Sequence, residues 1–160
     1  MQDPVEQFVE RMGLMMEAEG MPRIAGRLFG FLLLHEQAFS LDELAERLQV
    51  SKASVSTNAR ALEQAGVLER MSSPGDRRDY YQLGPDAWER TLRTAQRRWR
   101  ALRTTFDQAS ASLPPEMEAG KRRLQEAGRF HDVMIDGVDR LVEEWEEVKA
   151  ATEAPTGSVG

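Results

Sequence analysis

The chain has 160 residues, a net charge of −6 and no cysteine. Its length allows one well-packed domain with an extension, and the lack of cysteine excludes disulfides, thiolate metal sites and a cysteine nucleophile. The longest apolar run, residues 28–34, is too short to span a bilayer, and the N-terminus has no basic segment followed by an apolar one. We therefore expect a cytoplasmic protein without a membrane partner.

The first forty residues predict two helices. Residues 5–19 place an apolar side on one face, with Phe8 and Met12 at its centre, and Gly20 ends the helix. Pro22 opens a second helix that runs to His35, where apolar side chains recur at helical spacing.

Two short capped helices follow, joined by a tight turn. Ser40 is an N-cap residue and Glu43 completes a capping box, so the first helix covers residues 41–48. Gln49 and Val50 form the turn, and Ser51 caps the second helix. This pattern is typical of a helix-turn-helix, whose second helix enters the major groove of DNA.

The second helix separates an apolar side from a small polar one. Val55, Ala59 and Leu62 face inward, and Gly66 ends the helix with a positive φ. Small hydroxyls and a few bases on the other side suit close approach to a major groove. The predicted DNA contacts are Ser51, Lys52, Ala53, Ser54, Ser56, Thr57, Asn58 and Arg60.

A two-stranded ribbon is predicted after this helix. Residues 67–71 and 80–83 form its strands, and Ser73-Pro74-Gly75-Asp76 turns the chain. Arg77 and Arg78 lie at the turn, from which a guanidinium can enter a narrow minor groove, and Asp76 or Asp79 can orient it. The fold class is therefore mainly α with a small β-wing, a winged helix-turn-helix followed by long helices.

The chain resembles the MarR superfamily of bacterial transcription regulators, and within it the GbsR-like branch. The resemblance is carried by four segments of the sequence, which are residues 21–27, 41–45, 51–57 and 74–81. It implies a homodimer that binds an inverted repeat in double-stranded DNA. It also implies a small-molecule effector that binds between the DNA-binding domain and the helices that join the subunits.

Two long helices with heptad spacing follow the wing. Trp88, Leu92, Ala95, Trp99, Leu102, Phe106 and Ala109 form the first seam. The second seam runs along the last helix, from about residue 116 to 150. Since one subunit cannot cover helices this long, we expect a second copy as the partner. The predicted dimerisation residues are Phe8, Met12, Leu124, His131, Val138, Leu141 and Trp145.

Three aromatic side chains on the first long helix, Trp88, Trp99 and Phe106, are candidate effector contacts through cation–π attraction, with a core role as the alternative. Arg90, Arg93, Arg97 and Arg100 form a stripe on the same helix. We interpret this stripe as a solvated face paired with acids of the last helix, and contact with flanking DNA is the other reading.

The charge distribution is compatible with a DNA partner. From residue 107 onward there are twelve acids and six bases, so residues 1–106 are neutral overall and a local patch there can be positive.

No residue pattern indicates catalysis, a cofactor or a metal site. We expect a sequence-specific DNA-binding regulator of the repressor type; the alternative is a winged-helix module that binds another protein. The predicted organisation assigns residues 1–20 to dimerisation, 21–84 to DNA binding, 85–152 to dimerisation and the effector, and 153–160 to a disordered tail.

Overall fold

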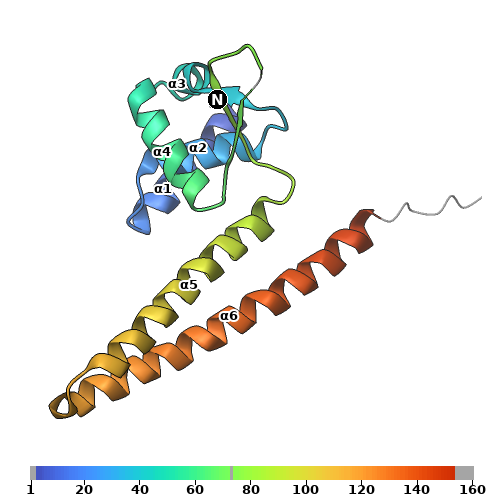
Figure 1. Ribbon diagram of the computed structural model, residues 1–160. Coiled ribbons are helices and arrows are strands. Elements are labelled where there is room, and N and C mark those ends of the chain that lie inside the picture. Colours follow the sequence, from blue (N-terminus) through green and yellow to red (C-terminus); the bar gives the residue numbers. More distant parts are fainter. Residues whose placement is uncertain (1–2, 73, 154–160) are drawn as a thin grey trace, which may run out of the picture. The chain divides into compact units, whose positions relative to one another are not determined.

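The computed structural model describes residues 3–72 and 74–153, and the chain divides into two compact units, residues 1–91 and 92–160. The first contains four helices and a small antiparallel sheet, and the second is a pair of long helices (Figure 1). The predicted fold class, mainly α with a small β-wing, is confirmed. In the described part of the chain no helix is long and apolar enough to cross a membrane.

Helix α1 (Pro4–Ala18) packs closely on α2 (Arg23–Leu33), and glycines on α2 permit this approach. A Cβ atom added to Gly26 would lie 2.3 Å from the Met12 carbonyl oxygen, and one added to Gly30 would lie 2.9 Å from Met12 Cβ. Met12, expected at a dimer interface, therefore packs against α2 and the core of its own subunit. Phe8 is half-buried.

The helix-turn-helix forms as predicted. Helix α3 (Leu41–Leu48) begins with a capping box between Ser40 and Glu43 and ends at Gln49, whose φ of 54° is left-handed. The Ser51 Oγ atom accepts a hydrogen bond from Ser54 N at the start of α4 (Lys52–Gln64). Gly66 follows α4 with a φ of 81°, the positive value expected from the sequence.

The wing consists of β2 (Glu69–Ser72) and β3 (Asp79–Gln82), which pair antiparallel. A third strand, β1 (Phe39–Ser40), pairs with β3 on its other side and was not predicted. It escapes prediction because it has only two residues, and Ser40 also caps α3. Beneath the sheet, the side chains of Leu28, Leu44, Val55 and Tyr81 are fully buried in one core.

Helix α5 (Ala87–Ser112) starts in the first unit, where the Trp88 ring meets the Phe29 ring edge to face at 6.1 Å. In the second unit α5 is followed by a short 3-10 helix, η1 (Pro115–Met117), and then by α6 (Glu118–Glu153), which runs antiparallel to α5 (Figure 1). Gln96 Nε2 donates to the Ile135 carbonyl at 2.9 Å, and Arg103 Nε donates to Asp132 at 2.9 Å. The two long helices are thus each other's partners over part of their length.

The heptad seam expected on α6 does not stay on one face. A straight α-helix drifts by about 20° per heptad relative to a 3.5-residue repeat. Val138 accordingly lies buried, His131 meets the Phe106 ring of α5 at 5.2 Å, and Leu141 and Val148 are exposed. Val138 is therefore packed inside the subunit, which corrects its expected placement in an intersubunit seam. His131 is only half-buried and stays a predicted dimerisation residue. Leu124 and Trp145 are half-buried.

The predicted disordered tail, residues 153–160, lies outside the described residues except for Glu153, which ends α6.

Candidate nucleic-acid interface

Helix α4 presents a polar face opposite its buried side. Lys52, Ala53, Thr57 and Arg60 are exposed, and Val55, Ala59 and Leu62 on the other side are buried in the core. Ser51 is also exposed, and Ser54 and Ser56 are half-buried. The structure thus places seven of the eight helix residues expected to contact DNA on or beside the exposed surface.

The eighth residue, Asn58, is a correction. Its side chain is only 8% exposed, and its Nδ2 atom donates to the Ser54 carbonyl at 2.8 Å. Asn58 lies one turn after Ser54 and beside Ala59, on the flank that turns toward the core. Its amide satisfies the helix backbone and is not available to a base edge.

Local hydrogen bonds fix the small hydroxyls on this face. Ser51 Oγ donates to Ser54 Oγ at 3.0 Å, and Thr57 Oγ1 donates to the Ala53 carbonyl at 3.0 Å. Arg60 makes no hydrogen bond or ion pair with another described residue. The face therefore combines ordered small groups with one guanidinium that is available for a partner.

Lys52 has an acidic neighbour that the sequence did not predict. Its Nζ atom lies 2.8 Å from a carboxylate oxygen of Asp42 on α3, and both side chains are more than half exposed. An exposed pair of this kind contributes little to stability, about 0–1 kcal/mol. A phosphate can therefore replace Asp42 as the partner of Lys52 at small cost.

At the wing, Asp76 holds the side chain of Arg78. Asp76 accepts hydrogen bonds from the Arg78 backbone nitrogen at 3.0 Å and from Arg78 Nε and a terminal nitrogen at 3.1 and 2.7 Å. The Tyr80 hydroxyl donates to the same carboxylate at 2.8 Å, and the Arg78 guanidinium lies 5.4 Å from the Tyr80 ring centroid. These hydrogen bonds, first those from Arg78, hold the pKa of Asp76 well below its usual range.

The two wing arginines differ in their surroundings. Arg77 is exposed and forms no hydrogen bond or ion pair among the described residues, whereas Arg78 is oriented by Asp76. Asp79, the other acid expected to orient an arginine, instead lies 3.7 Å from Arg70. Ser73, part of the predicted turn, lies outside the described residues.

The arginine stripe of α5 contacts the protein itself. Arg93 pairs with Asp139, and Arg100 lies 3.9 Å from the same carboxylate. This confirms for both arginines the predicted pairing with acids of the last helix. Arg97 donates to Thr94, and Arg90 Nε donates to the Gly66 carbonyl at the end of α4 at 3.0 Å.

The three aromatic residues expected to hold an effector do not form one site. Trp88 contacts Phe29, and Phe106 contacts His131. Trp88 and Phe106 lie 18 positions apart on α5, about 27 Å along the helix axis, and Trp99 lies between them. A cleft with a volume of about 610 Å³ lies between α1, α2 and the end of α3. It could not be predicted from the sequence because its walls come from separate helices. Within residues 3–72 and 74–153, no cluster of three or more His, Asp or Glu side chains could hold a metal ion.

Comparisons with known proteins agree with this geometry. A family model described as "MarR family" matches residues 19–79, and one described as "MmpR5-like MarR family transcriptional regulator" matches residues 86–148. The HTH-type transcriptional regulator MmpR5 of Mycobacterium tuberculosis is 38% identical over 123 residues, which are 76% of this chain and 74% of the relative. The HTH-type transcriptional repressor OpcR of Bacillus subtilis is 29% identical over 84 residues, 52% of this chain and 45% of the relative.

A solved structure is similar over nearly the whole chain. It is a crystal structure of a transcriptional regulator, with a TM-score of 0.79 and 34% identity, and the match covers 91% of this chain and 99% of the other.

Proposed function

Because this chain belongs to the MarR family of transcriptional regulators, and is thus a DNA-binding regulator, we propose that it binds a pseudo-palindromic operator as a homodimer and represses transcription there. The observation that carries the proposal is the pairing of an exposed polar face on α4 with a wing arginine that Asp76 and Tyr80 already orient.

Each of these two surfaces suits one groove of DNA. Ser56, Thr57 and Arg60 lie on the exposed side of α4, and a helix with such small side chains can approach base edges in the major groove. Arg78 lies on a thin ribbon, and a narrow A·T-rich minor groove attracts a guanidinium through its concentrated negative potential. Lys52 and Arg77 supply charges for phosphates, which position the protein on the duplex.

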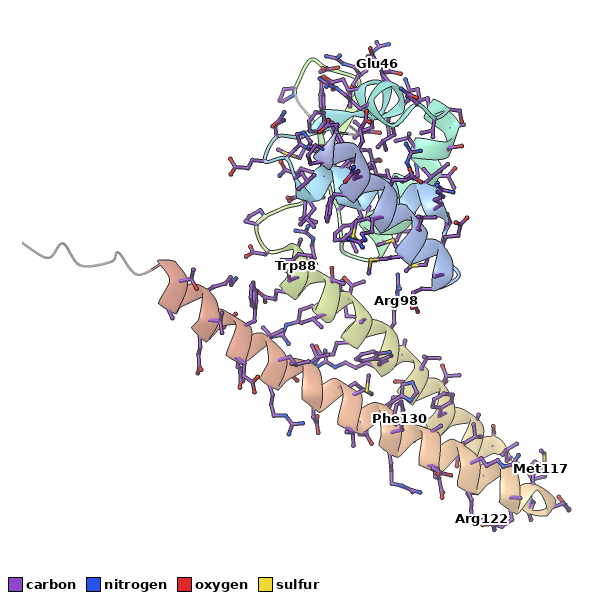
Figure 2. All side chains as sticks on the ribbon, turned by 180° about the vertical axis from the view of Figure 1, so that it is seen from behind. Glu46, Trp88, Arg98, Met117, Arg122 and Phe130 are labelled. Atoms are coloured by element: carbon purple, nitrogen blue, oxygen red, sulfur yellow. The ribbon has the colours of Figure 1, made fainter. Side chains whose placement is uncertain are left out.

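The dimer is supported by an apolar face of α6 that α5 does not cover. Four apolar side chains of this face are each more than half exposed: Phe130, Val133, Leu141 and Val148. Phe130 is labelled in Figure 2. At 100° per residue these four positions fall within about 80° of one another around the helix, and they extend along roughly 27 Å of it. We propose that a second copy covers this face, since single exposed apolar residues are common but four large ones on one side of a helix indicate an interface.

Several finer assignments belong to the same proposal. Repression is supported by the name of the relative OpcR, and the GbsR-like branch by the four sequence segments that resemble it. We assign residues 21–84 to DNA binding, and α1, α5 and α6 to dimerisation. In this proposal the protein acts in the cytoplasm, where the DNA is, and it is a regulator and not an enzyme. A small-molecule effector controls its affinity for the operator.

The dependence of DNA binding on salt tests the proposal. We expect the purified protein to bind random duplex DNA with an affinity that falls steeply between 50 and 200 mM salt, because each phosphate contact releases counterions. Lys52→Ala and Arg77→Ala are each expected to lower the slope by about two, one for each subunit of the homodimer. Arg122→Ala is the matched control, since Arg122 lies on α6 and is exposed, with only a distant acid at 3.9 Å (Figure 2).

A different result would indicate a different partner. Negligible affinity for DNA at 50 mM salt would refute the proposal and favour a winged-helix module that binds another protein. An equal loss in the Arg122 variant would refute the assignment of the DNA-binding face to α4 and the wing.

A further inference from the structure

A side chain from the start of α5 holds the C-terminal end of α4, the helix proposed to enter the major groove. Arg90 Nε donates to the Gly66 carbonyl at 3.0 Å. Gly66 ends α4 with a φ of 81°, and its own nitrogen donates to the Glu63 carbonyl at 2.9 Å. A cation here satisfies a carbonyl at the helix end and lies at the negative end of the helix dipole. Arg90 therefore caps α4 from outside that helix.

A missing side chain at Gly84 leaves room for this contact. A Cβ atom added to Gly84 would lie 2.6 Å from Glu69 Oε2 and 3.1 and 3.2 Å from the two terminal nitrogens of Arg90. Glu69 belongs to β2 and accepts a hydrogen bond from Gln82 Nε2 of β3 at 3.3 Å. The guanidinium of Arg90 thus lies beside a carboxylate at the base of the wing as well as at the end of α4.

Stability alone does not explain an arginine at this position. The Nη2 atom of Arg90 is buried, and no described residue accepts a hydrogen bond from it. Burial of a donor without an acceptor is unfavourable, and an apolar side chain would avoid that cost. A buried guanidinium nitrogen is also badly placed to reach a DNA phosphate. The contact that remains is the one with the end of α4.

The first turn of α5 is itself fixed within the first unit. Ala87 is buried, and its nitrogen donates to the Gly84 carbonyl at 3.1 Å. The Trp88 ring, at the start of α5 in Figure 2, meets the Phe29 ring of α2. With Arg90 on the end of α4, this turn of α5 is tied to the loop after β3, to α2 and to α4.

We propose that Arg90 is a positioning residue for DNA binding. By capping α4 from the first turn of α5, it fixes the orientation of α4 relative to α5 and thereby decides which spacing between two half-sites the dimer accepts. This inference rests on the proposed function, because it requires a homodimer with one α4 in each half-site. A change of one base pair in the spacing moves a half-site by about 3.4 Å and turns it by roughly 34–36° around the DNA axis. A rigid link between α4 and α5 discriminates against such a shift, whereas a loose link tolerates it.

Operators with altered spacing test the inference. Duplexes that the wild type selects from a random-sequence library supply the half-site, and the spacer between half-sites is then lengthened or shortened by one or two base pairs. We expect the wild type to prefer one spacing by about tenfold or more in affinity. Arg90→Gln, and Arg90→Met, which keeps an unbranched stem without a donor, should each reduce this preference to about threefold or less. Their affinity for a duplex with a single half-site should change by less than about twofold.

Arg97→Gln is the matched control. Arg97 also lies on α5 and is exposed, and it donates to Thr94 of the same helix at 2.8 Å. Its replacement removes the same charge from the same helix and should leave the spacing preference unchanged. The dependence of affinity on salt should also be unchanged in the Arg90 variants, since loss of a phosphate contact would lower the slope by about two per dimer.

The other outcomes contradict the inference in distinguishable ways. A wild-type spacing preference in both Arg90 variants, the same loss in the Arg97 variant, or a wild type that binds all spacings equally would overturn it. Equal losses at every spacing and at the single half-site, or unfolding of both Arg90 variants, would show a role in stability and not in positioning. A lower salt slope would make Arg90 a phosphate contact instead. Absence of DNA binding by the wild type would refute the proposed function, and the inference with it.

Discussion

Replacement of Asp76 with alanine distinguishes two explanations of how the wing binds DNA. If the wing acts only through net charge, removal of an acid close to the phosphates should strengthen binding. If the wing acts through an oriented Arg78, the same change should weaken binding, because Asp76 accepts from both the backbone and the guanidinium of Arg78. The sign of the effect therefore tests the mechanism.

The magnitude favours orientation at physiological salt. Without Asp76 the Arg78 side chain, 59% exposed, must be immobilised when DNA binds, at a cost of about 0.5–1.5 kcal/mol for a side chain of this kind. Two wings in a homodimer double the cost to roughly 1–3 kcal/mol, about 5- to 150-fold in affinity. Removing both acids relieves repulsion of about 1 kcal/mol per dimer, counting one phosphate about 8 Å from each acid in water, and 0.15 M salt reduces this to roughly 0.4 kcal/mol.

Fluorescence anisotropy with a labelled operator, at 0.15 M salt and above, measures the effect. We expect the Asp76→Ala variant to bind about 3- to 80-fold more weakly than the wild type, which is the orienting cost less the relieved repulsion. Tyr80→Phe, which removes one of several bonds to Asp76, should have a smaller effect. Circular dichroism of both variants checks the fold. Unchanged or tighter binding of the Asp76 variant would refute the orienting role.

Four further outcomes are expected. Arg77→Ala should weaken operator binding by about 1–3 kcal/mol, and anisotropy showing no loss would remove it from the interface. Leu141→Glu should give a folded monomer, measured by light scattering, because Leu141 is 52% exposed in the subunit and its replacement affects only the dimer. Val142→Asp should instead unfold the α5–α6 hairpin, because Val142 is 1% exposed. A dimeric Leu141 variant would contradict the proposed interface. Asn58→Ala should lower the free energy of unfolding in urea by about 1 kcal/mol while operator affinity is unchanged, and the reverse pattern would restore Asn58 as a contact. Hydrogen bonds from Ser40 and from Gln96 lower the pKa values of Glu43 and Asp139, respectively. The two carboxylates therefore stabilise the folded state fully above about pH 4–5, and this stabilisation is lost as pH falls through the lowered pKa values. Urea unfolding measured at a series of acid pH values would detect the loss.

The helix-turn-helix could be predicted because its signals are local. Ser40, Glu43, Ser51 and Gly66 act within one helical turn, through caps and a positive φ, so the sequence suffices to place them. The wing turn is local in the same sense. The exposed residues of α4 follow from the helical period, and only Asn58, on the border between the two faces, was misplaced.

Features that depend on tertiary contacts could not be predicted in this way. The pairing of β1 with β3 joins residues about forty positions apart, and the packing of Met12 against α2 depends on the absence of side chains at Gly26 and Gly30. The heptad seam of α6 was read as one face because the spacing alone does not reveal whether helices supercoil or stay straight. The cleft likewise requires three helices to be packed before its walls exist.

Isolation of genomic DNA fragments retained by the purified protein, followed by sequencing and footprinting, tests the central claim most directly. The account predicts enrichment of an inverted repeat whose half-sites are about 10–10.5 base pairs apart or a multiple of that spacing, with protection of two successive major grooves and the adjoining minor grooves. Absence of an enriched sequence, or a single protected half-site bound by a monomer, would contradict it.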